Sequence, residues 1–393
     1  MLKILNYKFV LRYSKIWTIS LSLIISLIAC KPRNSDIGQG TSEQKKGRII
    51  SVDPENVSGI SFYELFSCVE LIPLETNDNS LIKSVTKLIS AGNKFYILDK
   101  DQGALFIFYK DGRYISKIQT LGRGPGEYTL LEDFTINEFN NNIELLNPRG
   151  EVLVYDTNGV FKERIRIPVR AIHYFANLSE ALTVFYSQYE PNKLIYYSRE
   201  EERIVKEEYQ VPDFIVRETP LISSYSPFST YNGKVTFFQG FTDTIYEFRD
   251  TNLSPRYIWD HGEYNLKINK IAMDKTIRYY TNFLRSSNFV YGYYCYGEND
   301  DYIITRFIHK NRWNFLFRSK KNNQNILVSK FQEKVNPPLF PVLSDNCMIA
   351  AVNPSEIQLL VNPSVLDEQN VLIYSNLVLE DNPVIIKYYF KGD

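Results

Sequence analysis

The chain has 393 residues and no net charge, with 45 Lys and Arg against 45 Asp and Glu. No long basic run occurs, which argues against a nucleic-acid partner, because phosphate binding needs a clustered basic face. The 29 tyrosines and 25 phenylalanines favour β structure, since aromatic and β-branched residues fit a pleated sheet.

The first 29 residues have the features of a signal peptide. Four basic residues and no acidic one accompany an apolar run over residues 16–29. That run is shorter than the roughly 20 apolar residues of a membrane-spanning helix. We therefore expect residues 1–29 to be removed on export, which leaves 41 Lys and Arg against 45 Asp and Glu.

The run ends in Leu-Ile-Ala followed by Cys30, which resembles the bacterial lipobox. The resemblance implies a lipid on Cys30 and a location in the cell envelope, and Lys31 in place of Asp resembles sorting to the outer membrane. The alternatives are an ordinary membrane anchor and a signal peptide with an incidental cysteine. Residues 30–48 are polar and charged, so we expect a flexible tether before a folded domain over residues 49–393.

Short apolar runs separated by turns begin at residue 69. Strands are expected at 69–75, 95–99, 105–108 and 114–118, with Asp111-Gly112 between the last two. An Asp-Gly pair between apolar runs indicates a β-hairpin, because both turn residues tolerate a positive φ.

The same pattern then recurs. Asn158-Gly159 lies 47 positions after Asp111-Gly112 in a matching context, and Asn232-Gly233 begins a third copy. A repeat of short strands with this period is typical of a β-propeller blade. We therefore predict an all-β, six-bladed β-propeller, with blades near 85–130, 131–170, 171–215, 226–262, 286–335 and 339–391.

Two further features complete the predicted fold. The last strand, 384–390, is expected to share a blade with residues 69–74, so that the N- and C-terminal strands close the ring. Apolar spacing from Ile268 to Leu284 predicts a short helical insertion near 265–285, and residues 353–370 suggest a second, broken one.

The segment from Phe95 to Tyr128, which ends in Gly-Arg-Gly-Pro-Gly-Glu-Tyr, resembles the six-bladed β-propeller lipoproteins of Bacteroidetes, which are relatives of the NHL-repeat propellers. The close match covers residues 69–168 and is looser beyond them. The resemblance implies a fold and an envelope location but no settled activity, because function resides in sites and not in folds.

The glycine-rich loop within this segment is the first candidate site. It permits two interpretations: a backbone cradle in which Arg123 clamps an anion, or a tight crossover between blades pinned by an Arg123–Glu127 pair. The spacing fits neither a dinucleotide fingerprint nor a phosphate loop. The residues concerned are Gly122, Arg123, Gly124, Gly126, Glu127 and Tyr128.

Other reactive residues are sparse. The three histidines, His173, His261 and His309, form no close sequence pair, so we expect neither a metal nor another cofactor. After Cys30, the cysteines are Cys68, Cys295 and Cys347, and their pairing stays open. An aromatic cluster at residues 291–296, with Trp313 and Phe315 nearby, suits either packing between blades or stacking against a ligand.

These observations predict a membrane-anchored binding module for an unidentified protein, peptide or glycan, with recognition at the ring axis. No catalytic residue is assigned. The alternatives are a carboxylate-dependent lyase or glycoside hydrolase with an axial active site, and a structural subunit of an envelope complex.

Overall fold

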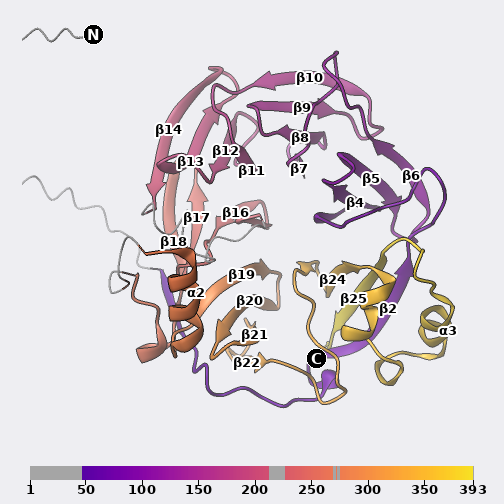
Figure 1. Cartoon of the computed structure of the whole chain (residues 1–393), viewed down its shortest axis with the longest axis vertical. Coiled ribbons are helices and arrows are strands. Elements are labelled where there is room, and N and C mark those ends of the chain that lie inside the picture. The colour runs from indigo at the N-terminus through magenta and orange to yellow at the C-terminus, as the bar shows by residue number, and fades with distance from the viewer. Residues whose placement is uncertain (1–46, 212–225, 269–270, 272–274, 393) are drawn as a thin grey trace, which may run out of the picture. The chain divides into compact units, whose positions relative to one another are not determined.

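The computed structural model describes residues 47–211, 226–268, 271 and 275–392. The signal peptide, Cys30 and nearly all of the expected tether lie outside the described residues. Six sheets follow one another around a ring, and each has at least four strands (Figure 1). The predicted six-bladed β-propeller is therefore confirmed, and we number its blades 1 to 6 in chain order from β3.

The first three blades are consecutive four-stranded sheets, and each runs from the ring axis outward. Blade 1 consists of β3 (Lys87–Ala91), β4 (Lys94–Asp99), β5 (Ala104–Tyr109) and β6 (Tyr114–Ile118). Blade 2 consists of β7 (Asp133–Ile136), β8 (Ile143–Asn147), β9 (Glu151–Tyr155) and β10 (Phe161–Arg166). Blade 3 consists of β11 (Ile172–Asn177), β12 (Leu182–Ser187), β13 (Asn192–Ser198) and β14 (Arg203–Gln210).

The last three blades include the two strands that come from the N-terminal part of the chain. Blade 4 consists of β15 (Phe228–Tyr231), β16 (Lys234–Phe237), β17 (Thr244–Arg249), β18 (Asn252–Asp260) and β1 (Arg48–Ser51). Blade 5 consists of β19 (Tyr291–Glu298), β20 (Tyr302–His309), β21 (Arg312–Ser319) and β22 (Asn325–Val328). Blade 6 consists of β23 (Val342–Leu343), β24 (Cys347–Val352), β25 (Val384–Phe390) and β2 (Phe66–Pro73).

The first strand of each blade lies at the centre of the ring. β3, β7, β11, β15, β19 and β23 contact one another in that order, and β23 contacts β3 again. Residues from six distant parts of the sequence therefore surround one axis.

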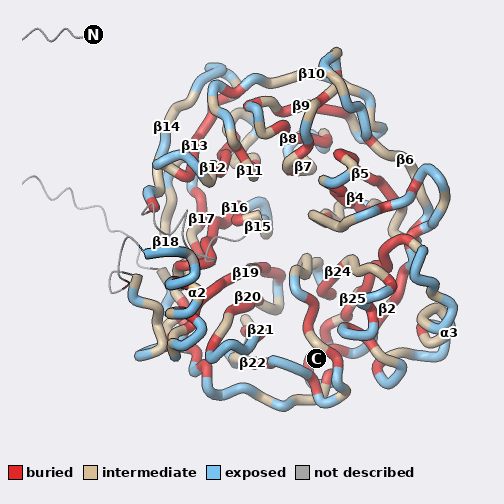
Figure 2. The backbone as a smooth tube through the Cα atoms, viewed as in Figure 1, coloured by how far each residue is buried: buried red, intermediate tan, exposed pale blue. Residues whose placement is uncertain are grey.

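The hydrophobic core is divided among the six seams between blades. Much of the strand backbone that borders these seams is coloured as buried in Figure 2. Successive residues of a strand point to opposite faces of its sheet. Phe95 and Ile97 of β4 thus pack with side chains of blade 6, such as Ile349. Tyr96 and Leu98, which point the other way, pack toward blade 2. A blade buries both faces only because it has a neighbour on each side, so stability depends on a closed ring.

Blade 6 closes the ring as predicted. β2 pairs antiparallel with β25, from Phe66 opposite Phe390 to Pro73 opposite Val384. The tip of the β5–β6 hairpin fits against the end of β2, where Glu75 donates from its N–H to the Gly112 carbonyl. A Cβ on Gly112, whose φ is +89°, would lie 2.2 Å from the Pro73 carbonyl oxygen, so this contact requires glycine.

Strand β1 was not predicted. It begins at Arg48, the last residue that we assigned to the tether, and pairs parallel with β18 at the outer edge of blade 4. Ile50 of β1 and Val52 just after it are buried in the seam between blades 4 and 5. Residues 49–51 of this strand lie within the domain predicted over residues 49–393.

Helices occur in the two segments for which the sequence predicted insertions between strands. The insertion contains η2 (Gly262–Tyr264) and α2 (Ile277–Ser286), which Thr276 caps by accepting from the Tyr279 N–H. The second, broken insertion contains η4 (Pro354–Leu359), η5 (Pro363–Val365) and α3 (Glu368–Asn376), and η1 (Phe62–Glu64) precedes β2. Within the described part of the chain, no helix has the length and apolar character needed to cross a bilayer.

Candidate functional site

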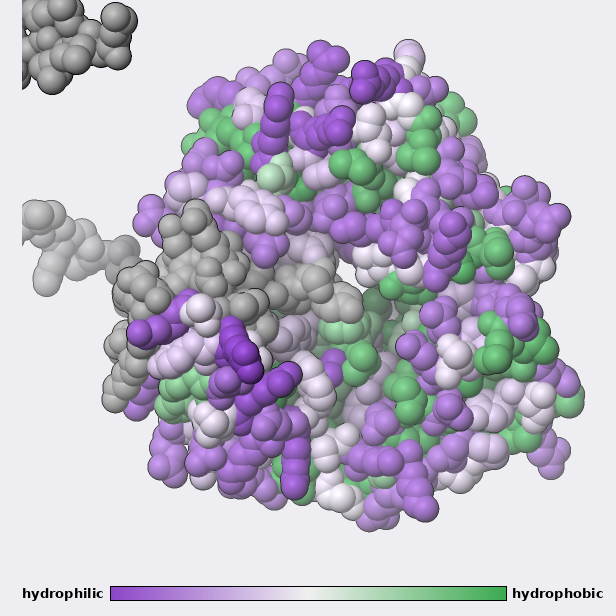
Figure 3. Space-filling model, in the orientation of Figure 1, coloured by the Kyte–Doolittle hydropathy of each residue, from purple (hydrophilic) through white to green (hydrophobic). Residues whose placement is uncertain are grey.

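A cavity of about 1090 Å³ opens at the ring axis and extends between blades 5 and 6. All six inner strands contribute to its wall. Figure 3 shows the corresponding hollow near the centre of the ring, with hydrophobic side chains inside it. Its volume is at the upper end of the roughly 300–1,000 Å³ typical of ligand pockets, so this cavity is the candidate site.

One wall of the cavity carries a buried ion pair between blades 1 and 2. Lys87 Nζ lies 2.7 Å from Asp133 Oδ1 and also donates to the Phe134 carbonyl oxygen at 2.8 Å. The Phe175 N–H of blade 3 donates to the other carboxylate oxygen of Asp133. Burial raises the pKa of the Asp133 carboxyl above its ordinary value, although Lys87 acts in the opposite direction. A second pair, Lys100 with Glu132 at 2.6 Å, lies beside the first.

The opposite wall carries Glu298 at the end of β19. Its carboxylate lies 2.8 Å from Arg256 of blade 4 and 2.8 Å from Lys320 of blade 5, and it accepts from the Tyr296 hydroxyl. Burial alone raises the pKa of Glu298, but the hydrogen bonds from Arg256 and Lys320 outweigh burial and hold that pKa below its ordinary value. Glu298 is therefore an ionised link between blades.

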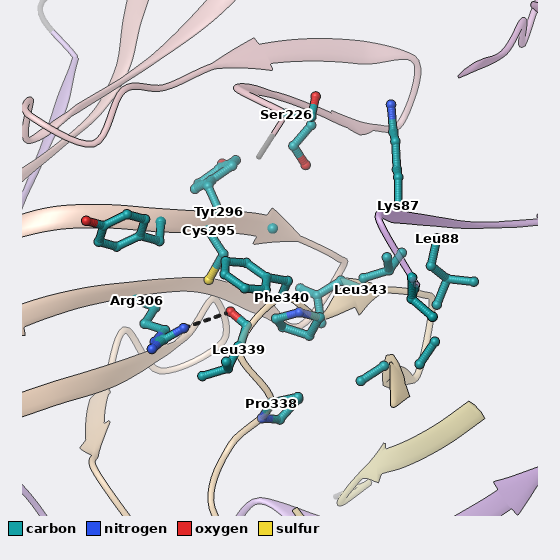
Figure 4. A pocket seen from close by; sticks show the side chains of 18 of the residues that line it. Lys87, Leu88, Ser226, Cys295, Tyr296, Arg306, Pro338, Leu339, Phe340 and Leu343 are labelled. Carbon is teal, nitrogen blue, oxygen red and sulfur yellow. Dashed lines mark hydrogen bonds between the residues drawn. The ribbon is translucent and has the colours of Figure 1, made fainter. Parts of the chain in front are cut away.

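The part of the cavity between blades 5 and 6 is aromatic. The Arg306 guanidinium lies 3.6 Å from the centre of the Trp313 ring and donates to the Leu339 carbonyl oxygen at 3.2 Å (Figure 4). Trp313 itself is 43% exposed, although it is a large apolar side chain. Asn314, the next residue of β21, points the opposite way: like Leu316 it faces the seam between blades 4 and 5, where its Oδ1 has no hydrogen-bond partner among the described residues. An exposed indole in a pocket of this size is a feature of a ligand site.

Comparison with known proteins identifies the family. The family described as "Domain of unknown function (DUF4934)" matches residues 48–389. The chain belongs to this family. No curated protein matches the chain.

The chain is also similar in fold to solved structures. A protein of Bacteroides fragilis NCTC 9343 that is described as exported has 18% identity and a TM-score of 0.70, over 88% of this chain and 100% of its own. A member of the DUF4221 family from Bacteroides vulgatus ATCC 8482 has 10% identity and a TM-score of 0.49, over 83% of this chain and 97% of its own. At 18% identity, the first likeness shows the fold alone.

In the DUF4934 chain, the glycine-rich loop connects β6 to β7 and is not among the residues that line the cavity. Three of its carbonyl groups accept hydrogen bonds from side chains of blade 2: Arg164 donates to the Gly124 and Glu127 carbonyl oxygens, and the Tyr155 hydroxyl donates to the Gly126 carbonyl oxygen. Tyr128 is buried, and its hydroxyl donates back to the Gly103 carbonyl. These contacts make the loop part of the scaffold between blades 1 and 2.

The expected Arg123–Glu127 ion pair is not among the ion pairs of the described residues. The Glu127 carboxylate instead accepts from the Gly124 N–H at 2.7 Å, and a Cβ on Gly122 would meet that carboxylate at 2.0 Å. Arg123 is exposed to solvent. A carboxylate that folds back over the loop thus replaces the predicted pair.

The histidines of the DUF4934 chain lie apart. His261 is buried, donates from Nδ1 to the Val52 carbonyl and accepts at Nε2 from the Tyr293 hydroxyl, both at 2.9 Å. Burial lowers the pKa of His261 to about 4. His309 contacts Glu55, whereas His173 packs against the Tyr189 ring. Among the described residues, no three His, Cys, Asp or Glu side chains gather as metal ligands.

The three described cysteines are free. Cys68 is exposed, and Cys295 and Cys347 are buried in different seams. Burial raises the pKa of the Cys295 thiol to about 12, so this thiol stays protonated at neutral pH.

The aromatic cluster is divided between a seam and the cavity. Tyr293 packs between blades 4 and 5, whereas Tyr294, Tyr296, Trp313 and Phe315 line the cavity. Sequence reasoning missed Lys87, Asp133 and Arg306 as members of the site. The signal available for Lys87 was a lysine at the start of an inner strand, and nothing local distinguished the other two.

Proposed function

We propose that this DUF4934 chain is a lipid-anchored envelope protein that binds a ligand in its axial cavity. The observation that supports binding most directly is the cavity between blades 5 and 6, where Trp313 is exposed. The indole would gain from a ligand by burial of its apolar area.

The envelope location rests on the sequence and one neighbour. The basic, apolar start and the lipobox-like Cys30 are typical of a bacterial lipoprotein, and the similar Bacteroides fragilis protein is described as exported. Outer-membrane sorting and kinship with NHL-repeat propellers are further predictions of the sequence. Metabolic labelling with a radioactive fatty acid tests the anchor, because wild type should carry label and Cys30→Ser should not. Equal labelling of both would contradict lipidation at Cys30.

Two buried carboxylates of the cavity wall are committed to ion pairs. Glycoside hydrolysis needs two carboxyl groups free to exchange protons with the substrate. The buried carboxylates of the wall, Asp133 and Glu298, are each held by basic side chains from neighbouring strands or blades. We therefore assign both to the scaffold.

Ligand binding is tested on the full chain purified in detergent, with intrinsic tryptophan fluorescence as the readout. Glycan and peptide arrays supply candidates, and a true ligand should change the fluorescence of wild type but bind Trp313→Ala at least tenfold more weakly. Arg123→Ala is the matched control, because Arg123 is exposed and remote from the cavity wall. Failure of every array compound to bind, or unaltered binding by Trp313→Ala, would refute the proposal.

A further inference from the structure

The inner strand of blade 6 is much shorter than the strand beside it. β24 has six residues, all of which pair with β25, but β23 has two and pairs only with Met348 and Ile349. In the other five blades the inner strand has four to eight residues. Half of β24 therefore lacks an inner neighbour.

The direction of the β24 backbone groups follows from two hydrogen bonds. The Asn346 carbonyl accepts from Phe390, so Asn346 faces β25, whereas the Cys347 carbonyl accepts from Ser344 on the inner side. Polar groups of alternate residues point to alternate sides of an antiparallel strand. Ile349, opposite Val342, and Ala351 thus turn their N–H and C=O groups inward. In the described part of the chain, no backbone partner meets Ala351 on that side.

The chain that precedes β23 is held away from this edge. Arg306 donates to the Leu339 carbonyl oxygen, and Asn336 donates from its N–H and its side chain to the Leu359 carbonyl oxygen. Leu339 and Phe340 form a bend instead of continuing the strand. The edge at Ala351 consequently faces the cavity, whose wall includes Ala350, Ala351 and Val352.

An independent observation places an exposed apolar ring in the same cavity. Trp313 of β21 is 43% exposed, and the Arg306 guanidinium lies 3.6 Å from the centre of its ring. The cavity thus offers a strand edge that needs both a donor and an acceptor, and beside it the exposed Trp313 ring.

We propose that β24 receives an extended peptide from a partner protein, which adds a strand to blade 6 inside the cavity. This inference rests on the proposed function and names its ligand class. A peptide residue in an extended conformation presents one N–H and one C=O to the same side, which is what Ala351 lacks and what inner strands provide in the other blades. Such strand addition uses main-chain hydrogen bonds for affinity and side-chain pockets for specificity. Trp313 provides an apolar surface for a side chain of the peptide.

The test starts from peptides selected on the full chain in detergent out of a random, phage-displayed library. Each selected peptide is then synthesised with one backbone N–H at a time replaced by N-methyl. Strand addition predicts that methylation weakens binding at least about tenfold at alternate positions and little at the positions between them. The Ala351→Pro variant should bind the unmodified peptides more weakly to a similar extent. The Ala351→Ser variant, which keeps the backbone N–H, should bind them as wild type does.

The possible results separate this inference from the proposed function. Peptides that bind with no alternating effect of N-methylation would overturn strand addition but leave the cavity as a binding site. Selection of glycans but no peptides would overturn the ligand class alone, whereas no ligand of either kind would overturn the proposed function itself. The N-methyl series uses the wild-type protein, so it decides the question even if Ala351→Pro does not fold.

Discussion

Replacement of Lys87 by alanine is expected to destabilise the ring through Asp133. The ion pair is 2.7 Å long, and the Asp133 side chain is 1% exposed, so the variant leaves a carboxylate buried without its counter-charge. Removal of one partner of a buried pair costs about 3–5 kcal/mol. For a domain of this length, that corresponds to a fall of roughly 4–7 °C in Tm, from about 2.1 cal/mol/K of unfolding entropy per residue.

The pH dependence of this loss has a definite sign. Burial already raises the pKa of Asp133 above 3.8, so the folded state binds its proton more tightly than the unfolded state. Stability from this group is therefore greatest in acid and declines as the pH rises from 3.8 through the folded pKa. Without Lys87, that decline in stability should be larger. The difference in stability between wild type and Lys87→Ala should therefore shrink as the pH is lowered.

Thermal unfolding followed by circular dichroism at pH 5 and pH 7.5 checks both statements. Lys87→Ala combined with Asp133→Asn should recover most of the lost Tm, because no charge then remains buried. Lys100→Ala is the matched control: its pair with Glu132 is more exposed and should contribute less than about 1 kcal/mol. Equal melting of wild type and Lys87→Ala at pH 7.5, or a double variant no better than the single one, would refute the reasoning.

Three other predictions concern the scaffold and share the same unfolding measurement. Gly112→Ala should lower the free energy of unfolding by more than about 2 kcal/mol, because the added Cβ meets the backbone of β2. Gly233→Ala, with φ +68° and open space around the Cβ, should lower it by about 1 kcal/mol, and equal losses in the two variants would contradict this explanation. The lowered pKa of His261 predicts stability that is present above pH 6.5 and lost as the pH falls toward 4, and His261→Gln should reduce that acid sensitivity. Ile386→Ala, in the closing strand, should lower the free energy of unfolding by about 2–5 kcal/mol. Leu379→Ala, at a residue that is 72% exposed, should change it by less than about 0.5 kcal/mol. A small effect at Ile386 would argue against closure of the ring through β25.

The fold was predictable because its signals are local. Asp111-Gly112 and Asn158-Gly159 mark equivalent hairpins, between β5 and β6 and between β9 and β10. The apolar stretch 384–390 became β25 at the expected place, opposite the early strand β2. Turn chemistry and strand patterning depend on neighbouring residues, so one sequence suffices to recognise them.

Other elements depend on contacts that local patterns do not encode. β1 has only four residues and is a strand because β18 offers it an edge on which Ile50 can be buried. The helix near 265–285 was correctly expected, but α2 itself begins at Ile277, where Thr276 provides the cap. The aromatic residues at 291–296 alternate between seam and cavity, and their sequence alone does not say which ring faces which.

The candidate site was the least predictable part because a propeller assembles its axis from single residues of distant strands. Lys87 and Asp133 are neighbours only after blades 1 and 2 pack together, and Trp313 reaches the cavity from the third strand of blade 5. The short β23 has a similar origin. Pro337, Pro338 and Pro341 lack an N–H and so disfavour a continuous strand before β23. The contacts that hold this segment away from β24 come from Arg306 and Leu359, at quite different positions, and no local pattern reveals them. An unpaired edge is therefore a property of the closed ring, and the repeat that predicts six blades does not tell which of them leaves part of a strand without an inner neighbour.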